Sequence, residues 1–291
     1  MLGTGIAAAT LGTASADVLR NDDPQIYVFT KPLQELDMQQ LAELLATWPV
    51  VGIEATIRKG GQIESKDAKE KLPRLYEALL ARQRHQMILA TDIDSADHPD
   101  VDAVLKTASK LGIRYFRMAY FKYQLDRPMV PQLESFAKQA KRLAEVASSL
   151  NMTGLYQNHA GVGYVGAAVW DLVEILQGIA PQHLAIAIDI RHTTIESTTA
   201  WVHAYERAKP HLGAVFVKDA VIERGQAKDV PLGQGFQAKS LFQRILKQGI
   251  PGPMSLHMEH LDHRDPMLLN KRIEATSKDI STLREWLSQK G

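Results

Sequence analysis

Carboxylate, imidazole and ammonium side chains recur in this sequence at the ends of short apolar runs, where they could act in acid–base chemistry. The apolar run 184–188 ends in Asp189, and His192 follows three positions later. A buried carboxylate is costly unless it is paired or bound to a ligand, so Asp189 is expected to contact a cation or a substrate. Lys218 and His257 occupy similar positions later in the chain. Together these residues predict a polar, anion- or metal-binding pocket.

Eight short apolar runs alternate with segments of helical spacing. Apolar residues at i, i+3 and i+4, as in Leu41, Leu44 and Leu45, give each helix one face that must cover a sheet. Strands separated by helices are parallel, because a parallel return needs a crossover connection. Eight such units in about 270 residues fit a single (β/α)8 TIM barrel, for which about 250 residues is typical. The expected strands are 26–30, 50–57, 86–93, 113–120, 153–159, 184–192, 213–220 and 254–259.

The active site of a TIM barrel lies at the carboxyl ends of its strands, so polar residues there are the functional candidates. Some have a structural alternative: Glu54 can pair with Arg117 inside the barrel, and His159 can bond only loop carbonyls. Tyr120 can pack in the core, although its hydroxyl also suits a sugar. The candidates are Glu54, Lys59, Tyr120, Gln157, Asn158, His159, Asp189, Arg191, His192, Lys218, His257 and Glu259.

The composition excludes several classes of function. The chain of 291 residues has 34 Lys and Arg against 33 Asp and Glu, without the basic cluster that a nucleic-acid-binding surface requires. It has no cysteine, which rules out disulfides, thiolate metal sites and cysteine nucleophiles. No apolar run reaches the length needed to span a bilayer, so a membrane is not an expected partner. Nucleic acid is not an expected partner either, because the basic cluster is lacking. The sequence leaves the oligomeric state open.

The first 20 residues are typical of a processing segment. The stretch 2–16 is uncharged and mildly apolar, and it ends in Ala14-Ser15-Ala16, the pattern that a signal peptidase cleaves. A signal peptide also begins with positive charge, whereas the first basic residue here is Arg20. Residues 1–20 are therefore expected to be the end of an export signal, which predicts a periplasmic protein, or a disordered tail of a cytoplasmic one. Residues 21–291 contain no Pro-, Gly- or Ser-rich linker and are expected to form one TIM-barrel domain.

Five motifs, in the order of the predicted strands, resemble those of the sugar phosphate isomerase/epimerase family, the xylose isomerase-like barrels. Residues 189–192, DIRH, are similar to its sixth-strand D-x-x-H signature, and 217–219 to its seventh-strand VKD. The other three motifs are YQNH at 156–159, LGQG at 232–235 and MSLHME at 254–259. The resemblance covers residues 24–288, and EATIRKGG at 54–61 is similar to an exported, mostly uncharacterised branch of the family.

The resemblance implies a metal-assisted reaction on a keto sugar. In the family, a divalent ion held by two Glu, one Asp and one His chelates the sugar oxygens and stabilises the enediolate that forms when a neighbouring C–H proton leaves. The two Glu carboxylates remove and return that proton. Moving the proton to the adjacent carbon isomerises the sugar, and returning it to the other face epimerises it.

The sequence departs from this ligand pattern at three of the four positions. Asp189 matches the family's Asp, but Gln157 stands for the fifth-strand ligand, Phe216 for the seventh-strand His and His257 for the eighth-strand Glu. Gln157, Asp189 and His257 are therefore the candidate ligands of one divalent ion, Mn, Zn or Mg, in a weakened site. Lys218 points to the same side as Phe216 by strand alternation, so its ammonium can replace the charge of the metal.

The loss of both glutamates makes His257 the first-choice base, since an imidazole titrates near neutral pH. Lys218 is expected to stabilise an enolate oxygen, and His159 and Glu259 are further catalytic candidates. Arg58, Lys59 or Arg191 suits an anionic substrate group. The candidate substrate-binding residues are Glu54, Lys59, Tyr120, Asn158, Arg191 and His192.

Three functions fit these residues. The first is an isomerase or epimerase that abstracts a proton next to the carbonyl of a keto sugar or sugar derivative. The second is a lyase that uses the same abstraction to expel the substituent of a keto-glycoside by β-elimination. The third is a catalytically inactive carbohydrate-binding barrel. A small carbohydrate is the expected ligand in each case.

Overall fold

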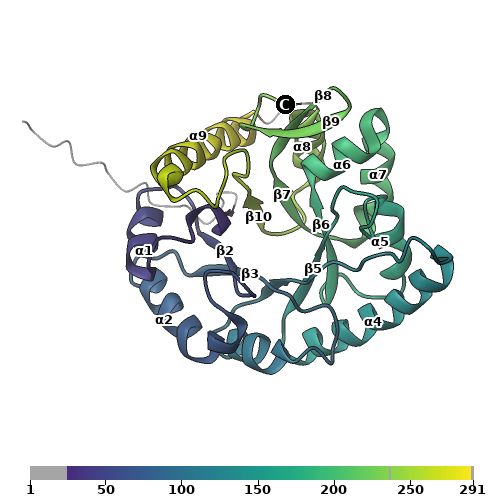
Figure 1. Cartoon of the computed structure of the whole chain (residues 1–291), viewed down its shortest axis with the longest axis horizontal. Coiled ribbons are helices and arrows are strands. Elements are labelled where there is room, and N and C mark those ends of the chain that lie inside the picture. Colours follow the sequence, from purple (N-terminus) through teal and green to yellow (C-terminus); the bar gives the residue numbers. More distant parts are fainter. Residues whose placement is uncertain (1–24, 236, 290–291) are drawn as a thin grey trace, which may run out of the picture.

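Eight parallel strands close into a barrel with helices around its outside (Figure 1). The computed structural model describes residues 25–235 and 237–289. The order of the strands around the barrel follows the chain, as the (β/α)8 prediction requires. The barrel strands are β1 (Ile26–Phe29), β2 (Gly52–Thr56), β3 (Gln86–Ala90), β4 (Tyr115–Arg117), β5 (Thr153–Gln157), β6 (Leu184–Asp189), β7 (Leu212–Val217) and β10 (Met254–Leu256).

The helices cover the barrel with their apolar faces. In α2, for example, Leu72, Leu75 and Leu79 are fully buried at the spacing of one helical face. The outer ring of helices consists of α1 (Met38–Ala46), α2 (Ala68–Leu80), α3 (Lys106–Lys110), α4 (Met129–Ser149), α5 (Val169–Ile175), α6 (Ile190–Ser197), α7 (Trp201–Ala208), α8 (Ala238–Gln248) and α9 (Leu269–Ser288).

The interior of the barrel changes from apolar to polar along the strands. A small apolar cluster that includes Tyr27, Leu155 and Phe216 fills one level. Because side chains on one face of a strand recur every second residue, Leu155 is followed on its face by Gln157, and Phe216 by Lys218. The same period that packs the core therefore delivers the polar residues to the carboxyl ends of the strands.

The sixth predicted strand extends too far. Residues 190–192 belong to α6, because Asp189 ends β6 and caps the helix by accepting a hydrogen bond from the backbone N–H of His192 on Oδ1 at 3.0 Å. The prediction of strand over 184–192 is therefore wrong for its last three residues. The cap fixes the Asp189 carboxylate at the strand end.

The seventh predicted strand divides into a barrel strand and a hairpin. Beyond β7, the chain forms β8 (Asp219–Glu223) and β9 (Gln226–Val230), an antiparallel pair that the sequence did not predict. Its two-residue turn has positive φ at Arg224 (51°) and Gly225 (78°), as a type I′ turn requires. A single glycine is a weak turn signal, which explains why the hairpin was missed.

Asp219 anchors the loop that follows this hairpin. Its Oδ2 accepts hydrogen bonds from the backbone N–H groups of Gly233 and Gly235, each at 3.0 Å. A Cβ at position 235 would lie 1.8 Å from Asp219 Oδ1, so only glycine fits there. The LGQG motif therefore serves the close approach of a loop to Asp219.

The N-terminal prediction lies outside the described residues. The structure describes the chain from residue 25, so the export segment proposed for residues 1–20 stays a prediction. Among the described helices, none combines the length and apolarity needed to cross a bilayer.

Candidate active site

A buried ion-pair network lies at the carboxyl ends of β2, β4 and β10. Glu54 accepts hydrogen bonds from Arg117 Nε on Oε1 and from Ser255 Oγ on Oε2, both at 2.6 Å. His257 Nε2 lies 2.7 Å from the same Oε2, which makes Nε2–H the donor. Glu54 is fully buried, and Arg117 and His257 are nearly so. The pairing of Glu54 with Arg117 is confirmed, and the carboxylate also orients His257.

The network keeps Glu54 ionised. Burial alone would raise the pKa of Glu54, but the charges of Arg117 and His257, with hydrogen bonds from His257 and Ser255, lower it to about 2. Burial alone would lower the pKa of Arg117, but the same carboxylate raises it. Each charge therefore depends on the other for its burial.

Replacing Glu54 with Gln is expected to lower the free energy of unfolding at pH 7 by about 3–5 kcal/mol, because Arg117 would be buried without its counter-ion. The folded pKa of Glu54 lies below its ordinary value of 4.5. Its stabilisation is therefore complete above that value and is lost as the pH falls towards 2. Urea unfolding of both proteins from pH 7 to pH 3 measures this difference, which should narrow with acidification. If the difference in the free energy of unfolding stayed constant over this pH range, the ion pair would be contradicted. The control is Glu70→Gln, because Glu70 forms an exposed ion pair with Arg74.

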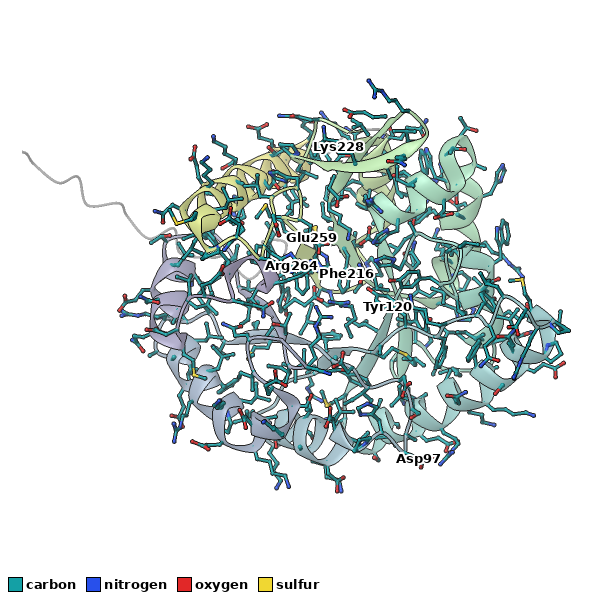
Figure 2. The ribbon with its side chains drawn as sticks, viewed as in Figure 1. Asp97, Tyr120, Phe216, Lys228, Glu259 and Arg264 are labelled. Carbon is teal, nitrogen blue, oxygen red and sulfur yellow. The ribbon has the colours of Figure 1, made fainter. Side chains whose placement is uncertain are left out.

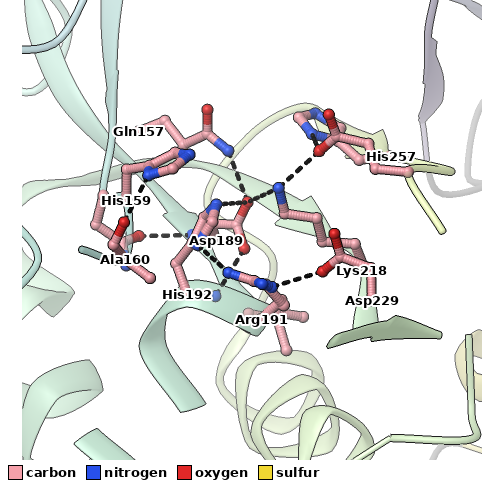
Figure 3. Close-up of polar contacts among 12 residues, drawn as sticks. Gln157, His159, Ala160, Asp189, Arg191, His192, Lys218, Asp229 and His257 are labelled. Atoms are coloured by element: carbon pink, nitrogen blue, oxygen red, sulfur yellow. Dashed lines mark hydrogen bonds and ion pairs between the residues drawn. The ribbon is translucent and has the colours of Figure 1, made fainter. Parts of the chain in front are cut away.

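Lys218, directly after β7, places an ammonium between two carboxylates. Its Nζ donates to Glu259 Oε2 at 2.7 Å and lies 3.6 Å from Asp189 Oδ2 (Figure 3). The other oxygen of Glu259 accepts from Lys31 Nζ at 2.8 Å. Burial alone would lower the pKa of Lys218, but the charges of Asp189 and Glu259 raise it. Lys218 is therefore a fixed positive charge within the site.

The three candidate metal ligands are engaged in other interactions. Gln157 Nε2 donates to Asp189 Oδ2 at 2.6 Å, and its Oε1 accepts the Tyr120 hydroxyl at 2.5 Å. His257 directs Nε2 at Glu54. Within residues 25–235 and 237–289, no group of three or more His, Cys, Asp or Glu could hold a metal ion.

This donor set does not fit a divalent ion. An amide N–H contacts the Asp189 oxygen that a metal would need, and the ammonium of Lys218 lies close to the same oxygen. Phe216, at the expected histidine position, is fully buried beneath the ring of His257, with ring centroids 4.9 Å apart. Lys218 places its ammonium 3.6 Å from Asp189 Oδ2, and the expectation that this charge replaces that of a metal stays a prediction.

One ring nitrogen of His257 has no partner. The ring stacks on Phe29 with centroids 4.4 Å apart, and Nδ1 lies 3.8 Å from Glu259 Oε2, too far for a hydrogen bond. Among the described residues, Nδ1 has no hydrogen-bond partner. Burial alone would lower the pKa of His257, but the carboxylates of Glu54 and Glu259 together raise it. Nδ1 is therefore a buried nitrogen that carries the lone pair of the neutral ring, in an imidazole whose pKa is raised.

His159, beyond β5, has the opposite electrostatic character. Its Nδ1 lies 2.8 Å from the carbonyl oxygen of Ala160 and donates to it, which leaves Nε2 as an acceptor. Burial and the charge of Lys218 lower the pKa of His159 to about 4, so the ring is neutral near pH 7. Figure 3 shows His159 and His257 on opposite sides of Lys218 and Asp189. This agrees with the strand order, in which β6 and β7 separate β5 from β10.

Two neighbouring cavities, of about 130 and 220 Å³, open among these side chains. Both are lined by Lys31, His159, Lys218 and Glu259, so they form one continuous polar hollow. Figure 2 shows Tyr120, Phe216 and Glu259 near the centre of the barrel. The smaller cavity is also lined by Phe29, Arg58, Arg117, Tyr120, Gln157 and His257.

The remaining candidates divide between the hollow and its supports. His192 and Arg191 line the larger cavity, where Arg191 pairs with Asp229 at 2.7 Å. Asn158 is fully buried and binds the backbone N–H of Asp189, so it supports the strand end. Lys59 is exposed on the β2–α2 loop and lines neither cavity. Asn158 and Lys59 therefore lie outside the lining of the two cavities, and their contact with a substrate stays a prediction.

Three residues of the site were not among the candidates. Lys31 pairs with Glu259, Ser255 binds Glu54, and Asp229 on the hairpin binds Arg191. Ser255 lies two residues before His257 at the end of β10, so the two-residue period could have identified it. Lys31 begins a 3-10 helix after β1, and only its place just beyond a strand end marks it. Asp229 had no such signal, because its hairpin was not predicted.

The sequence matches a known family over most of its length. The model of the family described as xylose isomerase-like TIM barrel matches residues 88–286, well over half of the chain. None of the curated proteins matches the chain.

Several solved structures have the same fold at low sequence identity. A D-tagatose 3-epimerase-like protein is 16% identical, with a TM-score of 0.70 over 91% of this chain and 98% of that one. L-ribulose 3-epimerase is 14% identical, with a TM-score of 0.68 over 92% and 96%. The 3-keto-D-glucoside 4-epimerase of E. coli is 14% identical, with a TM-score of 0.68 over 90% and 100%. At these identities the likeness establishes the fold alone.

Proposed function

The chain belongs to the xylose isomerase-like TIM barrel family, and from this premise we propose that it is a sugar isomerase or epimerase acting on a keto sugar or sugar derivative. The reaction begins with abstraction of a proton from the carbon next to the carbonyl. The observation that carries the proposal is the buried, unpartnered Nδ1 of His257 beside the fixed ammonium of Lys218 in one cavity. The similar solved structures include three epimerases or epimerase-like proteins, which supports this class of reaction.

His257 acts as the base. Glu54 accepts the hydrogen bond from Nε2–H, so the lone pair of the neutral ring lies on Nδ1. A carboxylate that orients a histidine base in this way is common in enzymes. The C–H bond breaks, its electron pair forms the C=C bond of the enolate, and the proton goes to Nδ1. The Glu54 carboxylate stabilises the resulting imidazolium, since their separation is 2.7 Å.

Lys218 stabilises the negative charge that develops on the carbonyl oxygen. Its ammonium is held by Asp189 and Glu259 before substrate arrives, so little reorganisation is needed when charge develops. The site is nearly closed to solvent around this group, which strengthens the interaction. Lys218 thereby supplies the electrostatic role that a metal has elsewhere in the family.

The fate of the proton determines the product. Return of the proton from His257 to the neighbouring carbon, together with transfer of the hydroxyl proton of that carbon to the former carbonyl oxygen, gives an isomer. Epimerisation needs a proton donor on the opposite face. His159 lies across the hollow from His257, and its Nε2, an acceptor in the neutral ring, would first take up a proton from solvent in order to deliver one there. Two imidazoles on opposite sides of one cavity favour these reactions over β-elimination, which needs only one face.

Incubation with a panel of keto sugars in heavy water tests the proposal by NMR. We expect deuterium to appear at the carbon next to the carbonyl, with a single product of unchanged mass apart from the label. Release of a second molecule from a keto-glycoside would show a lyase instead. Binding without any exchange would show an inactive carbohydrate-binding barrel.

A further inference from the structure

Arg58 is a cation of the cavity that forms no ion pair within the described part of the chain. It follows β2 and lines the smaller cavity together with Arg117 and Tyr120. Among the side chains of residues 25–235 and 237–289, none forms an ion pair or a hydrogen bond with its guanidinium. The other basic side chains of the hollow, Lys31, Arg117, Arg191 and Lys218, each contact a carboxylate.

The loop that carries Arg58 is held firmly in place. The backbone N–H of Arg58 donates to the carbonyl oxygen of Ile63 at 3.0 Å, and the backbone N–H of Ile63 donates to the carbonyl oxygen of Thr56 at 3.1 Å. The backbone N–H of Lys59 donates to Asp92 Oδ2 at 2.9 Å. The guanidinium is therefore presented to the cavity by a fixed turn, as expected of a binding group.

The position of Arg58 is electrostatically unfavourable in the free protein. Burial lowers the pKa of Arg58, and the neighbouring charge of Arg117 lowers it further, although the charges of Asp92 and Glu54 partly oppose this effect. Arg117 cannot share its counter-ion readily, because Glu54 is already bound by Arg117, Ser255 and His257. An anion beside Arg58 would relieve this strain on binding.

We infer that Arg58 binds a carboxylate group of the substrate, so that the substrate is a keto sugar acid. This inference rests on the proposed function, because it identifies the substrate class for the same site. Of the four basic side chains that line the smaller cavity, Lys31, Arg117 and Lys218 are each already paired with a carboxylate, which leaves Arg58 to bind an anionic group of the substrate.

A carboxylate fits better than a phosphate ester for two reasons. The planar fork of a guanidinium can bind two oxygens of either group, but one cation balances the single charge of a carboxylate and leaves part of the charge of a phosphate dianion uncompensated. Lys31, the other cation at the cavity wall, is already bound to Glu259 at 2.8 Å.

The inference is tested with three probes that differ at one carbon: D-fructuronate, D-fructose and D-fructose 6-phosphate. Wild type, Arg58→Gln and Arg58→Lys are compared by kcat/KM for deuterium exchange and by the shift in melting temperature on binding. The ratio of kcat/KM for fructuronate over fructose should fall about 30-fold in Arg58→Gln, the usual effect of losing a charged hydrogen bond. Arg58→Lys should retain part of the preference, because the charge remains.

The outcomes separate this inference from the proposed function. If no probe exchanges but fructuronate still stabilises the wild type and not Arg58→Gln, the carboxylate site stands and the proposed catalysis fails. An equal or larger preference for the phosphate ester, or for fructose, overturns the inference. So does an unchanged ratio in Arg58→Gln. The control is Arg74→Gln on the outer face of α2, where the arginine pairs with Glu70 and is 66% exposed.

Discussion

Replacing His257 with Gln is expected to reduce the rate of deuterium exchange about 1,000-fold, the middle of the range for loss of a general base. The amide of Gln can still donate to Glu54, so the buried carboxylate keeps a partner in place of His257 Nε2. It provides no group that accepts a proton. NMR with the best substrate of the panel measures the rate, and a variant that retains a tenth of the wild-type rate would exclude His257 as the base.

The pH dependence gives a second measure of the same role. Only neutral His257 can accept the proton, and the charge of Glu54 raises the pKa of His257 above its ordinary value of 6.5. We therefore expect kcat/KM to fall as the pH decreases through that raised pKa, and to level off above it. His183→Gln is the matched control, because His183 contacts Ser148 on the exposed surface. It should keep the wild-type rate and profile.

Replacing Lys218 with Met is expected to lower the rate about 100–1,000-fold, since removal of one preorganised donor to an oxyanion has this effect. The variant also leaves Asp189 and Glu259 without the charge between them. Its free energy of unfolding should therefore fall by about 3–5 kcal/mol, as when one partner of a buried pair is lost. Urea unfolding and deuterium exchange measure the two effects on the same protein.

Lys228→Met is the control for this substitution. Lys228 lies on β9 at the edge of the molecule, as Figure 2 shows, and its pair with Glu223 is exposed at 3.4 Å. The change in stability should stay within about 0.5 kcal/mol, which is usual for surface positions. If Lys218→Met is as stable and as active as Lys228→Met, the ammonium of Lys218 has neither role.

The sequence predicted the barrel because its evidence is local and repeated. Alternating apolar runs and helical stripes recur eight times, and each constrains only its own segment. The strand period also placed Gln157, Asp189, Lys218 and His257 at the same end of the barrel. These positions follow from β-strand geometry alone, so no knowledge of contacts was required.

The interactions among these residues could not be read from the sequence. Whether Gln157 offers its oxygen to a metal or its N–H to Asp189 depends on the orientation of an amide, which the strand period does not fix. The lack of a partner for Arg58 depends on where the carboxylates of other strands point. The hairpin of β8 and β9, with Asp229, depends on a turn at Arg224 that no strong turn residue marks.

Deuterium exchange by protein treated with a chelating agent tests the central claim most directly, namely that Lys218 and His257 carry out the proton transfer. The donor atoms around Asp189 are engaged by Gln157, with Lys218 close by, so the exchange rate should be the same before and after chelation. Loss of exchange on chelation, with recovery on addition of Mn²⁺, would contradict the claim and assign the charge to a metal ion.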